Sequence, residues 1–130
     1  MEALRRVLER DPRVAYALLF GSTARGSAHA DSDLDVAVGL SPGVRLDVTA
    51  LGDLIATLEA ATGRTVDLVL MDEAPPALAY RIFRDGEVMV ERDHAALVER
   101  KVRAILEYLD FKPLEELATR GVLAAAAHGR

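Results

Sequence analysis

The chain of 130 residues predicts an α/β (α+β) fold, a small mixed sheet of about four strands flanked by helices. Short apolar runs alternate with segments in which apolar residues recur at helical spacing, and no internal repeat or low-complexity linker interrupts this alternation. The hydrophobic content of 51% is enough for a single core. We therefore expect one domain over residues 1–112, followed by a helical or mobile tail over residues 113–130.

The first half of the chain predicts helix, strand, helix and strand in turn. Residues 1–10 carry apolar side chains between charged ones at the spacing of an amphipathic helix. Residues 14–20 are a continuous apolar run that ends at Gly21, as expected for a buried strand. Ser22 is suited to cap a short helix, and residues 34–38 alternate as a second strand.

The second half repeats this order. Apolar residues recur at helical spacing from 46 to 61, and Gly63 ends that helix. Residues 65–70 form a third strand, residues 77–84 a helix opened by two prolines, and residues 87–91 a fourth strand. We expect one face of the sheet to carry acidic side chains and the other to be covered by helices.

A final helix begins after Asp93, which is suited to cap it. We expect this helix to end near Asp110, because Pro113 disfavours helical backbone at the residue before it. One apolar stripe runs along it, with Leu97, Ala104 and Tyr108 nearby. The stripe consists of Val98, Val102, Ile105 and Leu109.

Two carboxylates stand on one face of the second strand. Successive strand residues point to opposite faces, so Asp33 and Asp35 share a face that Leu34 does not. At about 3.3 Å of rise per residue their Cβ atoms lie about 7 Å apart, and their oxygens can converge on Mg²⁺. Without a cation the two charges would repel, and one carboxyl would tend to keep its proton. The pair indicates a metal site, although an Asp-x-Asp segment alone is more often a solvated strand face or a capping run.

A turn suited to phosphate precedes this strand. Gly21 allows close approach of backbone to phosphate, and the helix start at Ser22 offers unpaired N–H groups to an anion. Alone, such a turn is usually a simple connection between a strand and a helix. Followed at a fixed distance by two carboxylates, it indicates a site for a nucleoside triphosphate and its cations.

This spacing resembles the signature of the polymerase-beta-type nucleotidyltransferases, in which Gly-Ser is followed after ten residues by Asp-x-Asp. The resemblance implies nucleotide contacts for Gly21, Ser22, Arg25 and Gly26, and metal binding for Asp33 and Asp35. For Arg25, an ion pair with Asp31 or Glu2 is as good an interpretation as a phosphate contact.

The family takes a third carboxylate from a later strand. In residues 65–70, Val66, Leu68 and Leu70 alternate inward and leave Asp67 on the opposite face. The resemblance therefore implies that Asp67 is a ligand of the metal that activates the nucleophile, or the general base. The alternative for Asp67 is an ordinary charge at the edge of a strand.

The resemblance extends to the smallest members of the superfamily, the minimal nucleotidyltransferases. Residues 108–113 are similar to the closing segment of members encoded beside a helical HEPN-domain ribonuclease toxin, for which they are antitoxins. This implies transfer of AMP from ATP to a tyrosine of the toxin, with two Mg²⁺ ions as cofactors and release of pyrophosphate. Two alternatives remain open: masking of the partner by contact without catalysis, and nucleotidyl transfer to a small-molecule or nucleic-acid hydroxyl.

Charge and composition exclude several other classes of protein. Residues 31–75 carry two basic and nine acidic side chains, and no aromatic cluster accompanies a basic stripe, so we expect no direct nucleic-acid partner. No apolar run approaches the length of a membrane helix, and the first helix lacks the apolar stretch of a signal peptide. Together with the absence of cysteine, this favours the cytoplasm. The oligomeric state, whether homo- or hetero-oligomer, stays open.

Overall fold

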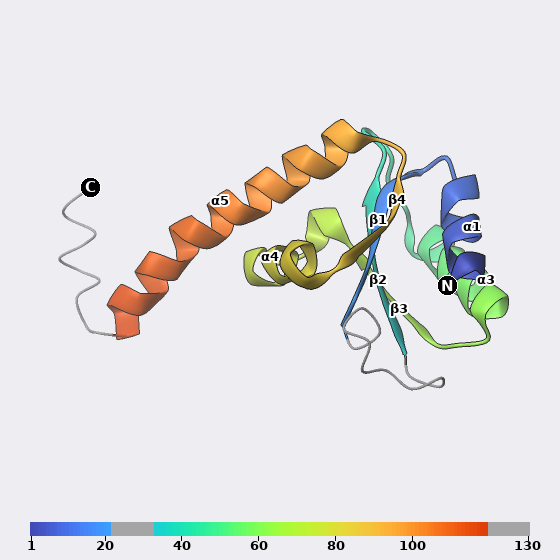
Figure 1. Ribbon diagram of the computed structural model, residues 1–130, viewed down its shortest axis with the longest axis horizontal. Coiled ribbons are helices and arrows are strands. Elements are labelled where there is room, and N and C mark those ends of the chain that lie inside the picture. Colours follow the sequence, from blue (N-terminus) through green and yellow to red (C-terminus); the bar gives the residue numbers. More distant parts are fainter. Residues whose placement is uncertain (22–32, 120–130) are drawn as a thin grey trace.

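The computed structural model describes residues 1–21 and 33–119, with the backbone alone from residue 111 onward. A four-stranded sheet stands between two layers of helices, and the last helix extends away from the sheet (Figure 1). The mixed α/β architecture predicted from the sequence is confirmed. The predicted short helix after Gly21 and the segment after Thr119 lie outside the described residues.

The sheet is mixed because its strands pair in both senses. Its four strands are β1 (Val14–Phe20), β2 (Leu34–Leu40), β3 (Val66–Leu70) and β4 (Glu87–Glu91). They lie in the order β3-β2-β1-β4, with β1 antiparallel to both of its neighbours and β2 parallel to β3. The end of β1 and the starts of β2 and β3 therefore meet at one end of the sheet.

The first face of the sheet is covered by α1 (Glu2–Arg10) and α3 (Val48–Thr62). Leucine side chains of both helices pack in one core with the apolar side chains of β1, β2 and β3. The bounds of α3 follow from local chemistry: the Ala50 N–H donates to the Asp47 carboxylate at 2.7 Å, and Gly63 ends the helix in the left-handed conformation. Gly63 is thus confirmed as the end of this helix.

The second face is covered as well, by α4 (Pro76–Asp85) and α5 (His94–Thr119), which follow the short 3-10 turn η1 (Met71–Glu73) and β4. Ala37 lies on this face two residues after Asp35 and is fully buried among side chains of both helices. The expectation that helices cover only the face without acids is therefore wrong. The physical reason is that α4 and α5 also carry apolar stripes, which need a sheet face to bury them.

Helix α5 begins as predicted, since the Ala96 N–H donates to the Asp93 carboxylate at 3.0 Å. It does not end near Asp110 as predicted, because its backbone continues through Pro113 to Thr119. Proline removes one hydrogen-bond donor from a helix, and the bonds on either side can carry the helix past it. The division of the chain after residue 112 stays a prediction. Within the described ranges, no helix is long and apolar enough to cross a membrane.

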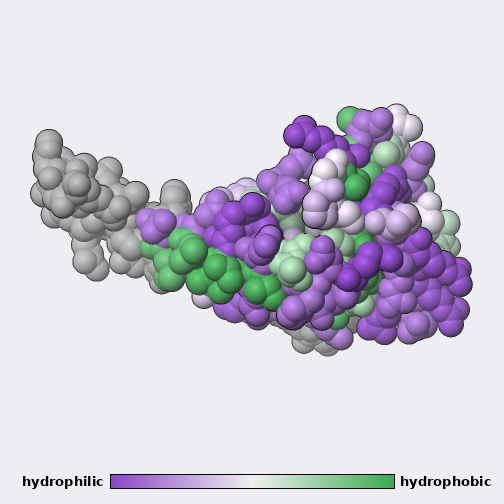
Figure 2. Space-filling model, turned by 90° about the horizontal axis from the view of Figure 1, so that it is seen from above, coloured by the Kyte–Doolittle hydropathy of each residue, from purple (hydrophilic) through white to green (hydrophobic). Residues whose placement is uncertain are grey.

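Helix α5 has two apolar sides, and the side that packs on the body is not the stripe identified in the sequence. Its inner stripe is Leu97, Arg100 and Ala104, all buried. Its outer stripe faces solvent and forms an apolar band along the helix (Figure 2). The outer stripe consists of Val98, Val102, Leu106 and Leu109.

Candidate functional site

Strand register brings the predicted carboxylates to one end of the sheet, which we call the carboxylate edge. Asp35 of β2 pairs with Phe20 at the end of β1 on one side and with Asp67 of β3 on the other. Neighbouring strands lie about 4.8 Å apart, so Asp35 and Asp67 stand side by side on the same face. Asp33 directly precedes β2, two residues before Asp35.

The turn after β1 is pressed against this edge. Gly21 has a φ of 74°, in the left-handed region that favours glycine. A Cβ atom built on Gly21 would lie 2.2 Å from Oδ2 of Asp35, closer than any real contact. Glycine is therefore required here for two reasons, backbone conformation and space for a carboxylate, and the second is invisible in the sequence.

The three carboxylates are accessible to a ligand, since Asp33 and Asp67 are exposed and Asp35 is half-buried. Carboxylate oxygens are the donors that Mg²⁺ prefers, so the kind of donor and the pairing of Asp35 with Asp67 fit a magnesium site. Across residues 1–21 and 33–119, however, no three acidic or histidine side chains converge closely enough to enclose a metal ion. The structure thus brings Asp35 and Asp67 together, and Asp33 lies two residues before Asp35 in the chain.

The other residues predicted to contact the nucleotide lie outside the described part of the chain: Ser22, Arg25 and Gly26. Their roles in binding a nucleotide stay predictions, and so does the alternative ion pair of Arg25.

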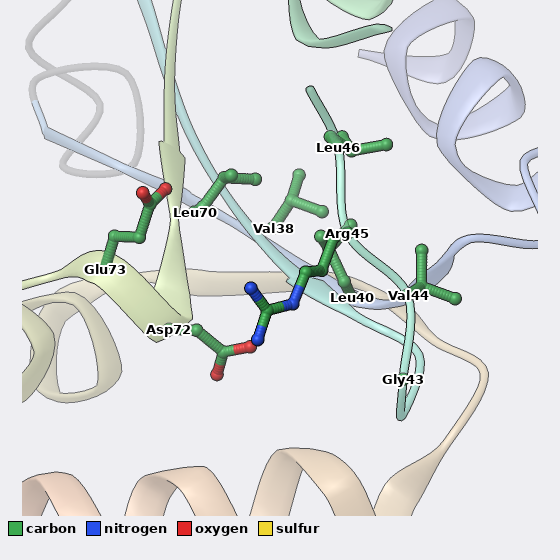
Figure 3. Close-up of a pocket in the computed structure, with 9 residues that line it drawn as sticks. All are labelled: Val38, Leu40, Gly43, Val44, Arg45, Leu46, Leu70, Asp72 and Glu73. Atoms are coloured by element: carbon green, nitrogen blue, oxygen red, sulfur yellow. The ribbon is translucent and has the colours of Figure 1, made fainter. Parts of the chain in front are cut away.

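A cavity of about 460 Å³ lies at the opposite end of the sheet (Figure 3). Val38, which lines it, is three residues along β2 from Asp35, about 10 Å away, and points to the other face. Arg45 and Asp72 point toward one another beside the cavity. Asp33, Asp35 and Asp67 do not line this cavity, which is therefore separate from the carboxylate edge.

One residue that the sequence analysis did not single out ties α5 to the sheet. The buried Arg100 guanidinium donates from Nε and Nη2 to the carbonyl of Met71, at 3.2 and 3.0 Å. Met71 directly follows β3, the strand that carries Asp67. The sequence could have indicated this role through spacing. Arg100 lies three residues after Leu97 and four before Ala104, and therefore on the same buried side of the helix.

Comparisons with known proteins agree with this arrangement. A family model described as polymerase beta nucleotidyltransferase matches residues 2–95. No curated protein matches the chain. A solved structure described as a minimal nucleotidyltransferase is 32% identical, with a TM-score of 0.56, and the match covers 66% of this chain and 89% of that one.

Two further structures match over nearly the whole chain. A toxin-antitoxin with AMP-PNP has a TM-score of 0.77 at 24% identity, covering 94% of this chain and 97% of that one. A tri-AMPylated Shewanella oneidensis HEPN toxin in complex with an MNT antitoxin gives a TM-score of 0.67 at 23% identity, covering 94% of this chain and 91% of that one. At these identities the two matches demonstrate a shared fold.

Proposed function

Because the chain belongs to the polymerase beta nucleotidyltransferase family, we propose that it transfers AMP from ATP to a tyrosine hydroxyl of a partner HEPN ribonuclease toxin. In this role it is the antitoxin of that partner and acts in the cytoplasm. The observation that carries the proposal is the carboxylate edge, where Asp35 and Asp67 stand side by side against the turn at Gly21.

The residues of the edge divide the chemistry between them. Asp33, Asp35 and Asp67 would hold two Mg²⁺ ions, which lower the pKa of an attacking hydroxyl and neutralise a pyrophosphate leaving group. The backbone of Gly21 and Ser22 would hold the β and γ phosphates, because a glycine turn at a helix start presents N–H groups to anions. Arg25 and Gly26 fall in the same turn and would contact the triphosphate.

The reaction is a single displacement at the α-phosphorus. The tyrosine oxygen forms a bond to phosphorus, the bond to the oxygen that bridges to the β phosphate breaks, and pyrophosphate leaves with both electrons of that bond. The tyrosine proton passes to Asp67 where Asp67 is the general base, and to solvent water where Asp67 is a metal ligand.

The choice of nucleotide and partner draws on the structural neighbours. One of them is a toxin-antitoxin with AMP-PNP, and another contains an AMPylated HEPN toxin with an MNT antitoxin. Both are matched over 94% of this chain, so the likeness includes α5 as well as the sheet. This supports ATP as the substrate and a helical HEPN toxin as the acceptor.

A second candidate function is masking of the toxin by contact alone. It is favoured by the outer stripe of α5, which is an apolar surface without a partner inside the described part of the chain. Masking requires no metal and no nucleotide, so the two candidates differ in what they do to the mass of the toxin.

Intact-protein mass spectrometry of the toxin separates the two functions. After incubation with ATP, Mg²⁺ and this protein, we expect one or more increments of about 329 Da, the mass of an AMP unit, on a tyrosine. The double variant Asp33→Asn with Asp35→Asn should form the complex without adding mass. Neutralisation of the toxin at unchanged mass, equally strong with the double variant, would contradict catalysis and establish masking.

A further inference from the structure

Among the described side chains, the outer stripe of α5 is the most extensive exposed apolar feature of a single element. Its side chains are 39%, 48%, 57% and 55% exposed at Val98, Val102, Leu106 and Leu109. Their spacing of four, four and three residues places them on one side of the helix. Single exposed apolar residues are ordinary, but a continuous row of four marks a surface for contact with another protein.

Rotation of α5 cannot bury this stripe against the body of the protein. The inner stripe is held by two hydrogen bonds from Arg100 to the Met71 carbonyl. Farther along, Tyr108 stacks on Tyr80 of α4, with ring centroids 4.1 Å apart and planes 7° from parallel. Turning the outer stripe inward would break these contacts and leave the carbonyl of the buried Met71 without its donors.

Helix α5 lies beyond the catalytic part of the chain. The family model ends at residue 95, and α5 begins at His94. Matches to the toxin-antitoxin structures cover 94% of the chain and leave 6% unmatched, whereas the 26 residues of α5 are 20% of the 130. Most of α5 must therefore be shared with those proteins, although the nucleotidyltransferase model does not include it.

We infer that the outer stripe of α5 docks the apolar face of an amphipathic helix of the partner toxin. The identity of the partner rests on the proposed function, and the surface is the new element. A ridge of side chains at this spacing packs into the groove of a second helix whose apolar residues recur every three or four positions. Docking on α5 would hold the acceptor protein while the carboxylate edge, on a different part of the fold, performs the transfer.

The inference is tested by Val102→Lys, alone and together with Leu106→Lys. The matched control is Val88→Lys on β4, because Val88 is 43% exposed and Val102 is 48% exposed. Affinity for the HEPN toxin that the proposed function assigns as partner is measured by calorimetry. We expect about tenfold weaker binding for the single variant, about 100-fold for the double variant, and less than about twofold for the control, because a buried unpaired ammonium group opposes association.

Two further measurements distinguish failure of this docking inference from failure of the proposed function. Thermal melting should be unchanged in all three variants, because these side chains are exposed. Mg·ATP affinity should be unchanged in the two α5 variants, because α5 extends away from the sheet (Figure 1). If the unmodified protein binds the toxin through α5 but adds no AMP, the docking surface stands and the transfer proposal fails. If the double variant binds the toxin as tightly as the unmodified protein, the inference is wrong. It is equally wrong if the chain alone is a dimer that these substitutions dissociate while toxin binding persists.

Discussion

The carboxylate edge and helix α5 are held in place by different kinds of interaction. At the edge, strand pairing on both sides of β2 positions Asp35 between the end of β1 and Asp67, and the turn at Gly21 closes over it. Helix α5 is held instead by its inner stripe, through a few buried side chains and the hydrogen bonds of Arg100. Substitutions at the edge should therefore change chemistry and leave the fold intact, whereas those on the inner stripe should change stability and leave chemistry intact.

The largest effect is expected for Asp35→Asn, which keeps the shape of the side chain and removes its charge. Loss of a ligand that supports the transfer by several kcal/mol should lower the rate by about 100-fold or more. Thermal stability should stay close to that of the unmodified protein. The control is Asp53→Asn on the exposed side of α3. Equal rates of AMP transfer in both variants would rule out a role for the edge in catalysis.

A smaller but still large effect is expected for Gly21→Ala. The added methyl group would displace the Asp35 carboxylate, since their separation would be 2.2 Å, and should lower transfer by about 10- to 100-fold. Gly43→Ala is the matched control, because Gly43 has a φ of 78° and nothing within 4 Å of a built Cβ. Both variants introduce the same backbone strain, so any excess loss of activity in Gly21→Ala measures the contact with Asp35. Equal losses in the two would assign the effect to backbone strain alone.

On the inner stripe, Arg100→Met should lower the free energy of unfolding by about 1 to 3 kcal/mol, because the buried Met71 carbonyl loses its donors. Arg103→Met, on the same helix and 55% exposed, should change it by about 0.5 kcal/mol or less. Urea unfolding of both variants checks this. Mg·ATP affinity should be unchanged in each, and a loss of affinity in Arg100→Met would show that α5 and the carboxylate edge are coupled through β3.

The smallest effect is a pH dependence beneath α5. Burial raises the pKa of the Tyr16 phenol from 10 to about 12. The folded state therefore keeps a proton that the unfolded state loses, so this contribution to stability is present below pH 10 and is lost as the pH rises toward about 12. Tyr16→Phe should remove this part of the alkaline decline in urea midpoint, with a change of about 1 kcal/mol or less at pH 7. An unaltered alkaline decline in the variant would contradict the assignment to Tyr16.

Much of the fold was predictable because its signals are local. Asp47 and Gly63 bound α3 through a capping hydrogen bond and a left-handed residue, and both act within a few positions of the chain. The alternation around Asp67 likewise depends only on the period of a strand. The end of α5 was missed because a proline changes one hydrogen bond, whereas the length of this helix depends on the bonds on either side.

For the candidate site, the sequence by itself determined which carboxylates are present and that Asp33 and Asp35 lie two residues apart before a buried strand. It could not place Asp67 beside Asp35, because these residues are 32 positions apart and only strand register joins them. It also could not choose between the two apolar sides of α5. That choice was made by packing, since the side with the small Ala104 and the donors of Arg100 fits against the sheet and η1, and the bulkier Val98, Val102, Leu106 and Leu109 remain outside. Periodicity shows that a helix has an apolar side, but only tertiary contacts determine which side is buried, because burial depends on the shape and hydrogen-bonding groups of the opposing surface.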